Sequence, residues 1–126
     1  MKNQLCLAAD IGGTNTRIAL FDSEVLLEDT CVTYSNNKYD SFESILAEYL
    51  DRVSISSVTH AGIAAAGPIE GTTAKMTNLS WSFSEGSIAS ITGAAHVGII
   101  NDLQAQGYGL KSLCLLYTSD AADDMQ

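Results

Sequence analysis

AADIGGTNTRIALF, residues 8–21, places a glycine pair between two apolar runs. The first run extends back to Gln4 and the second spans Arg17 to Phe21, so each has the length of a strand. A glycine pair between such runs predicts a tight turn joining two antiparallel strands. Val25 to Tyr34, rich in β-branched residues, can supply a third strand. Three strands therefore precede any helix.

Helical and strand patterns alternate in the next part of the chain. Ser41 and Ser44 come just before an apolar stripe at helical spacing that ends at Val53, which predicts a helix of about three turns. Ser57 to Ala65 is predicted to be a fourth strand, and its largely apolar character suggests a parallel strand buried on both faces. Gly67 opens a loop that we expect to run to about Trp81.

Three further elements complete the expected fold. Ser84 to Ile91 reads as a short helix, Val97 to Ile100 as a fifth strand, and Leu103 to Leu110 has helical spacing. The order is βββαβαβα, an α/β fold with a mixed five-stranded sheet and flanking helices. Ligands of such sheets gather beyond the carboxyl ends of the strands, where Asp10 and Asp102 follow apolar runs.

The composition is that of a soluble globular protein, with 46% hydrophobic and 17% charged residues. The formal net charge of −9 is negative, so the sequence gives no sign of a basic surface that would attract nucleic acid or an anionic membrane. No run reaches the roughly 20 apolar residues of a membrane span, and the first residues do not read as a secretion signal. The cytoplasm is the expected location.

The cysteines do not form a recognisable set. Cys6, Cys31 and Cys114 are odd in number and lack CxxC spacing, which favours neither a disulfide framework nor a zinc site. We expect small buried apolar side chains at these positions.

The end of the chain has an unusual reading. From Cys114 it runs CLLYTSDAADD, which matches, codon for codon, one reading frame of the end of a transposase-based DNA sequencing adapter. We therefore expect one domain, residues 1–113, followed by an adapter-derived segment, residues 114–126, that is not a domain. The natural gene product is then expected to continue beyond Leu113.

The turn after the first strand is the first candidate site. Asp10 is followed by Gly12 and Gly13, which accept positive φ and let consecutive backbone N–H groups face an anion. Thr14 adds a hydroxyl donor, and the Asp10 carboxylate suits Mg²⁺. An ordinary hairpin turn is the alternative reading.

Polar residues near the fifth strand form the second candidate site. Asp102 is either a helix N-cap or the base that accepts a proton from a hydroxyl attacking a phosphoryl group, and spacing does not decide between them. Asn101 and Asn78 can orient polyol hydroxyls, although either can be a turn or cap residue. His60 and His96 have no third ligand at metal spacing, which favours structural roles.

Three segments, taken together and in this order, resemble the bacterial glucokinase family. They are AADIGGTNTRIALF (residues 8–21), GIAAAGPIEGTTAKMTNLSW (residues 62–81) and IINDLQAQGYGL (residues 99–110). The resemblance extends to about Leu113. It implies the amino-terminal lobe of an actin-like ATPase, or ribonuclease-H-like, sugar kinase.

The resemblance also implies roles for residues at both sites. Asp10, Gly12, Gly13 and Thr14 match the motif that receives the phosphates of ATP and the associated Mg²⁺, with Asp10 on the metal. Asn101 matches a sugar-hydroxyl ligand, and Asn78 belongs to the neighbourhood of the sugar pocket. Asp102 matches the catalytic base that takes the proton of the glucose 6-hydroxyl as that oxygen attacks the γ-phosphorus.

The implied activity is ATP-dependent phosphorylation of glucose to glucose 6-phosphate, the entry to glycolysis, by a longer parent enzyme. A homodimer of that enzyme is one open expectation. Family members carry a Glu-x-x-His segment, a second phosphate motif and an adenosine motif that this chain lacks, so we expect negligible kinase activity from the chain alone.

Three alternatives stay open. One is a kinase of another hexose or of an acylated hexosamine. Another is a non-catalytic sugar-responsive regulator, although such proteins carry an amino-terminal helix-turn-helix and the first strand here begins within a few residues of Met1. The last is a binding-only actin-like fragment.

Overall fold

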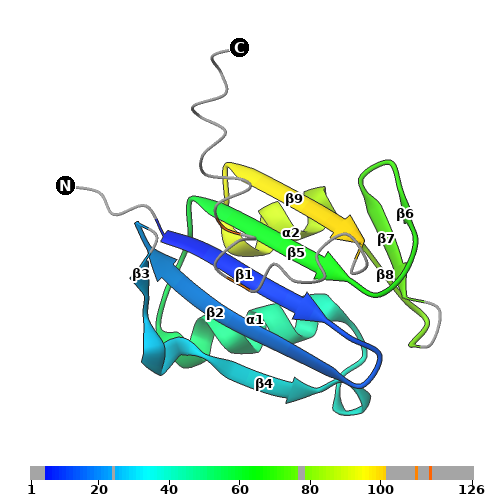
Figure 1. The fold of residues 1–126 in the computed structure, drawn as a ribbon, viewed down its shortest axis with the longest axis horizontal. Coiled ribbons are helices and arrows are strands. Elements are labelled where there is room, and N and C mark those ends of the chain that lie inside the picture. Colours follow the sequence, from blue (N-terminus) through cyan, green and yellow to red (C-terminus); the bar gives the residue numbers. More distant parts are fainter. Residues whose placement is uncertain (1–4, 24, 77–78, 102–109, 111–113, 115–126) are drawn as a thin grey trace.

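A mixed sheet forms the centre of the molecule (Figure 1). The computed structural model describes residues 5–23, 25–76, 79–101, 110 and 114. The strands of the main sheet are β1 (Leu5–Ile11), β2 (Asn15–Asp22), β3 (Val25–Leu26), β4 (Val32–Ser35), β5 (His60–Ala65) and β9 (His96–Asn101). Their order is β3-β2-β1-β5-β9, and β4 also pairs with β2. The predicted α/β class is confirmed, and the main sheet has six strands where five were expected.

The parallel strands decide where a site can form. β1 pairs with β2 antiparallel, whereas β1, β5 and β9 run parallel to one another. Ile11 lies opposite Ala65, and Ala65 lies opposite Asn101. The arrowheads of these three strands consequently point to the same edge of the sheet (Figure 1).

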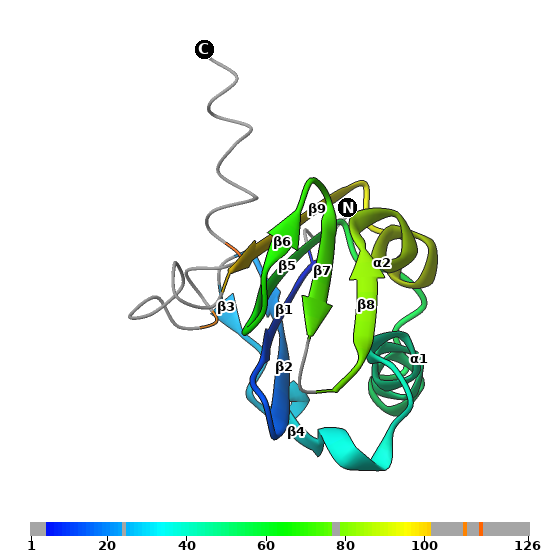
Figure 2. The same cartoon turned by 90° about the vertical axis from the view of Figure 1, so that its right-hand side faces the viewer.

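Both helices of the described chain cover one face of the sheet (Figure 2). They are α1 (Phe42–Val53) and α2 (Glu85–Thr92), and both were predicted. Ser41 caps α1 by accepting a hydrogen bond from the Ser44 backbone N–H at 3.1 Å, and Ser84 forms a capping box with Ser87. Five apolar side chains of α1 are buried: Phe42, Ile45, Leu46, Tyr49 and Leu50.

Alternating residues of the strands fill two apolar layers. Leu7 and Ile11 of β1 belong to the larger core beneath the helices, whereas Cys6 and Ala8 belong to a smaller cluster on the opposite face. Successive side chains of a strand point to opposite faces, so this pattern explains why β1 is buried almost throughout. Burying each leucine or isoleucine stabilises the fold by roughly 1.5–3 kcal/mol.

The third predicted strand is interrupted. Val25 to Tyr34 was expected to be one strand, but a 3-10 turn, η1 (Glu28–Thr30), separates β3 from β4. The Thr30 hydroxyl accepts a hydrogen bond from the Leu20 N–H at 3.0 Å and donates to the Leu27 carbonyl. These local bonds replace the ladder that a continuous strand would form with β2.

A small antiparallel sheet occupies the segment that was expected to be a loop. It consists of β6 (Ile69–Glu70), β7 (Thr73–Met76) and β8 (Trp81–Ser84), in the order β6-β7-β8. Gly71, with a φ of 64°, makes the turn between β6 and β7. The small sheet lies beyond the carboxyl ends of β5 and β9 (Figure 1).

The prediction for the cysteines was wrong in two respects. Cys6 and Cys114 form a disulfide, and Cys31 is exposed. The bonded cysteines are 108 residues apart in the sequence and meet on the face of the sheet opposite the helices. Their spacing carries no signature, because only the fold brings them together.

Candidate active site

The turn between β1 and β2 lies at the edge where the parallel strands end. The Gly12 N–H donates a hydrogen bond to the Asn15 carbonyl at 2.9 Å, which closes the hairpin. Gly13 and Thr14 are exposed at its tip. Among the described residues, nothing accepts a hydrogen bond from the N–H groups of Gly13 and Thr14. The exposed tip of the turn therefore carries two backbone donors and one hydroxyl.

The conformation of this turn differs from the expectation. The positive-φ glycines of the described chain are Gly71 and Gly93, so the hairpin does not depend on positive φ at Gly12 or Gly13. A Cβ at Gly12 would lie 3.4 Å from the Asn15 carbonyl oxygen, which is an ordinary contact. What glycine contributes at position 13 is an uncovered backbone at the exposed tip.

Asn36 holds the turn from the side of the helices. Its side-chain amide donates to the Gly12 carbonyl at 2.9 Å, and its side-chain carbonyl accepts from the Thr16 hydroxyl at 2.7 Å. Its backbone N–H donates to the Thr14 carbonyl, also at 2.9 Å. Asn36 and Thr16 are 1% and 0% exposed, so the bond between their side chains is shielded from water, and the bond to Gly12 is partly buried.

Asp10 lies one residue before the end of β1, on the face opposite the helices. Its carboxylate is 3.7 Å from the Arg17 guanidinium, which faces it across the β1–β2 ladder. The Asp10 side chain is 37% exposed, so it is accessible from solvent. An accessible carboxylate beside the turn is a suitable oxygen ligand for Mg²⁺.

Asn101 is the last residue of β9. Its side-chain amide donates to the Gly67 carbonyl at 2.8 Å and so ties β9 to the loop that follows β5. A Cβ at Gly67 would lie 2.2 Å from the Lys75 carbonyl oxygen. Only glycine therefore fits where this loop crosses β7.

The sheet brings two of the predicted regions to one edge. Ile11, Ala65 and Asn101 are in register, and neighbouring strands are about 4.8 Å apart, so the end of β1 and the end of β9 are separated by about 10 Å. Asn78 and Asp102, the other predicted site residues, lie outside the described residues. Asp102 follows Asn101 directly in the sequence.

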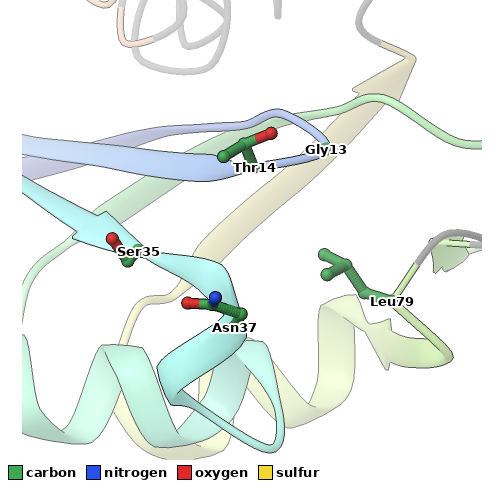
Figure 3. A pocket seen from close by; sticks show the side chains of 5 residues that line it. All are labelled: Gly13, Thr14, Ser35, Asn37 and Leu79. Carbon is green, nitrogen blue, oxygen red and sulfur yellow. The ribbon is translucent and has the colours of Figure 1, made fainter.

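A cavity of about 280 Å³ adjoins the turn (Figure 3). Five residues line it: Gly13, Thr14, Ser35, Asn37 and Leu79. They come from the β1–β2 turn, the end of β4, the 3-10 turn η2 (Asn36–Lys38) and the segment before β8. Hydroxyl and amide groups with one apolar side chain suit a neutral polar ligand or part of one.

The sequence did not identify the residues of β4 and η2 that surround the turn. The stretch from Ser35 to Asp40 reads as a polar loop, and a buried asparagine in a loop has the same sequence pattern as an exposed one. The partners of Asn36 lie 20 and 24 residues away along the chain. Only the tertiary structure reveals the contact.

The two histidines pair at the other edge of the sheet. The rings of His60 and His96 stack with centroids 5.0 Å apart, at the beginnings of β5 and β9. Within the described part of the chain, no group of three or more histidine, cysteine, aspartate or glutamate side chains could hold a metal ion.

Comparison with known proteins places the fold and the glycine turn in one family. The family model described as "Glucokinase" matches residues 7–117, which include β9 and all of β1 except Leu5 and Cys6. The chain belongs to the glucokinase family. A curated glucokinase from Chromobacterium violaceum is 36% identical over 107 residues, covering 85% of this chain and 30% of the relative.

Two solved structures extend the family comparison. A glucokinase from an Antarctic psychrotroph superposes with a TM-score of 0.71 at 32% identity, covering 83% of this chain and 34% of that one. A ROK family glucokinase from Streptomyces griseus, solved in complex with glucose and AMPPNP, has a TM-score of 0.59 at 22% identity. It covers 87% of this chain and 37% of its own, and this likeness concerns the fold alone.

The chain spans about a third of the length of the curated family members that it matches. Among the described residues, no helix is both long enough and apolar enough to cross a membrane.

Proposed function

We propose that the protein to which this chain contributes the amino-terminal lobe transfers the γ-phosphoryl group of ATP to glucose. The products are glucose 6-phosphate and ADP, and the reaction belongs to glycolysis in the cytoplasm. The observation that carries the proposal is the placement of the glycine turn and of the end of β9 at one edge of the sheet in a member of the glucokinase family.

The turn is the proposed phosphate site. Phosphoryl transfer requires the protein mainly to align the reactants and to stabilise charge. The N–H groups of the exposed residues Gly13 and Thr14, with the Thr14 hydroxyl, are donors of the kind that phosphate oxygens accept from. A chain with a net charge of −9 has few cations to offer, so backbone donors matter more here. The S. griseus complex with AMPPNP supports the choice of nucleotide.

Asp10 is the proposed ligand of Mg²⁺, directly or through water. Its side chain is accessible and lies one residue before the end of the strand that leads into the turn. When bound, the ion would neutralise charge on the phosphate oxygens. Arg17 forms an ion pair with this carboxylate at 3.7 Å.

The end of β9 is the proposed sugar site. Asn101 carries both a donor and an acceptor, which suits the hydroxyl groups of a sugar. Asp102 is the proposed base: its carboxylate accepts the proton of the 6-hydroxyl while the sugar oxygen bonds to the γ-phosphorus and ADP departs with the electron pair of the broken bond. Asn78 is proposed to lie near the sugar pocket.

An assay of sugar choice tests this function on the intact gene product. ADP release is coupled to a spectroscopic readout with glucose, other hexoses and acylated hexosamines as acceptors. The proposal predicts the highest kcat/KM with glucose. A higher value with an acylated hexosamine would identify a related kinase, and the absence of sugar-dependent ADP release with every acceptor would favour a binding protein or regulator.

We also propose that residues 1–113 are the lobe and that residues 114–126 derive from adapter sequence. The support is the codon-for-codon match of CLLYTSDAADD to the adapter end, together with the chain's coverage of about a third of its relatives. On this proposal the Cys6–Cys114 bond does not exist in the natural gene product. Resequencing the locus past codon 113 tests it, and a natural stop codon after codon 126 would refute it.

A further inference from the structure

We propose that Asn36 is a positioning residue for the phosphate-binding turn, a role that rests on the proposed kinase function. Asn36 lies 24 residues beyond Gly12 in the sequence and comes from η2, outside the motif that identifies the turn. It acts through the backbone of the turn and is not placed to contact the reacting atoms itself.

The contacts of Asn36 reach both ends of the turn. Its side-chain amide bonds the carbonyl of Gly12, where the turn begins, and its backbone N–H bonds the carbonyl of Thr14, where it ends. The third contact, from the Thr16 hydroxyl to the Asn36 side-chain carbonyl, fixes which way the amide faces. The Gly13 peptide is thereby held between two anchored carbonyl groups.

Within the described part of the chain, Asn36 supplies the side-chain hydrogen bond that reaches a backbone carbonyl of the turn. Its glycines are not locked by positive φ, and the bond from the Gly12 N–H to the Asn15 carbonyl closes the hairpin around the Gly13–Thr14 peptide. Hydrogen bonds that are shielded from water orient their partners more strongly than exposed ones. With Asn36 1% exposed, its bonds are the ones that fix the direction of the donors at the tip.

Removing the side-chain amide should therefore affect phosphate binding and spare sugar binding. Without it, the Gly12 carbonyl and the Thr16 hydroxyl lose buried partners, and the turn moves to find others. Asn101 bonds to Gly67 at the end of β9, about 10 Å away across two strands, and does not depend on Asn36.

The experiment compares three variants of the intact gene product. Asn36→Ala removes the two side-chain hydrogen bonds of Asn36 and keeps its backbone bond to Thr14, and Thr16→Val removes only the hydroxyl that orients the amide. Thr92→Val is the matched control, because the Thr92 hydroxyl is equally buried and bonds the Ile88 carbonyl at 2.8 Å. Thr92 is the last residue of α2, and its carbonyl accepts from the Val58 N–H just before β5, near the opposite edge of the sheet. KM for ATP, KM for glucose and the affinities for AMPPNP and AMP are measured, with thermal unfolding as a check of folding.

For Asn36→Ala we expect KM for ATP to rise roughly ten- to a hundredfold, with a smaller change of the same kind in Thr16→Val. AMPPNP affinity should fall in parallel. KM for glucose and AMP affinity should stay within about twofold of the parent, because neither ligand carries the terminal phosphates that the turn receives. Thr92→Val should lower the unfolding temperature without changing KM for ATP.

Two outcomes would overturn the role of Asn36. Unchanged KM for ATP in folded Asn36→Ala is one, and equal losses of AMP and AMPPNP affinity, which indicate a general structural effect, are the other. If Asn36→Ala does not fold, Thr16→Val decides by the same criteria. Failure of the proposed function is seen separately, because the parent protein itself would then show no sugar-dependent ADP release.

Discussion

Gly67 lies in close contact with the backbone of β7 and also binds Asn101 of the candidate sugar site. A Cβ at this position would lie 2.2 Å from the Lys75 carbonyl oxygen, and the Gly67 carbonyl is the acceptor for the Asn101 side chain. We expect Gly67→Ala to destabilise the fold by about 1–3 kcal/mol, because the loop has to move away from β7. Urea unfolding of the two chains measures the difference.

Gly86 provides the control for that substitution. It lies within α2, and an added Cβ would come no closer than 3.8 Å to the Ser84 hydroxyl. Gly86→Ala should therefore stabilise the chain by roughly 0.5–1 kcal/mol through helix propensity. Equal effects of the two substitutions would show that the contact at Gly67 is unimportant.

Asp102 is the residue on which the proposed chemistry depends. In the intact gene product we expect Asp102→Asn to keep glucose affinity within a few-fold and to lower kcat by about two to four orders of magnitude, because an amide cannot accept the proton. Single-turnover kinetics and glucose titration separate the two effects. Asp51→Asn, which alters an exposed carboxylate of α1, is the control.

Near-normal turnover in Asp102→Asn would remove that carboxylate from the mechanism. Candidates of this kind could be proposed from the sequence, because Asp10 and Asp102 come at the ends of apolar runs and belong to recognisable motifs. Asn36 was not, since its role depends on contacts 20 and 24 residues away in the chain. A local sequence pattern can indicate Asp10 and Asp102, whereas only the tertiary structure can indicate Asn36.

At the scale of elements, α1 is joined to η1 by a buried tyrosine. The Tyr49 hydroxyl donates to the Thr30 carbonyl at 2.8 Å, and burial, the main cause, raises the pKa of Tyr49 to about 12. The unfolded chain ionises near the ordinary value of 10, so the folded state favours the protonated hydroxyl. The resulting stability is complete below pH 10 and is lost as the pH rises toward 12.

We therefore expect the free energy of unfolding to fall between pH 10 and pH 12, and to fall less steeply in Tyr49→Phe, which has no proton to lose at this position. Denaturant unfolding at a series of pH values gives both slopes. Identical slopes for the two chains would contradict the assignment to Tyr49.

The elements were predictable where local signals agreed. Both helices have serine caps, α1 also has an apolar stripe, and the structure begins each helix within a residue or so of the expected position. The small sheet β6-β7-β8 was missed because β6 has only two residues and the glycines and proline around it read as breakers. The break at η1 was missed because it depends on hydrogen bonds of Thr30, one of them to β2.

At the scale of the whole molecule, the location of the candidate site could be predicted, because the carboxyl ends of parallel strands lie at the same edge of a sheet and ligands bind there. The Cys6–Cys114 pairing could not, because the bonded residues carry no spacing signal. The cavity beside the turn could not either, since its walls come from four separate segments.

The chain alone should not be a kinase. It spans about a third of the length of its curated relatives. We therefore expect that these 126 residues do not provide the second lobe that would close over the substrates and exclude water. We expect the purified 126-residue chain to release no glucose-dependent ADP above background in a coupled assay. Release at an ordinary enzyme rate would show that one lobe suffices.

The central claim is that the glycine turn and the end of β9 serve one phosphoryl transfer. A crystal structure of the intact gene product with glucose and AMPPNP tests it most directly. The account predicts the terminal phosphate at Gly13 and Thr14 and the glucose 6-oxygen beside Asp102, with that oxygen roughly 3–3.5 Å from the terminal phosphorus on productive closure. Glucose and the terminal phosphate bound on opposite sides of the sheet would contradict it.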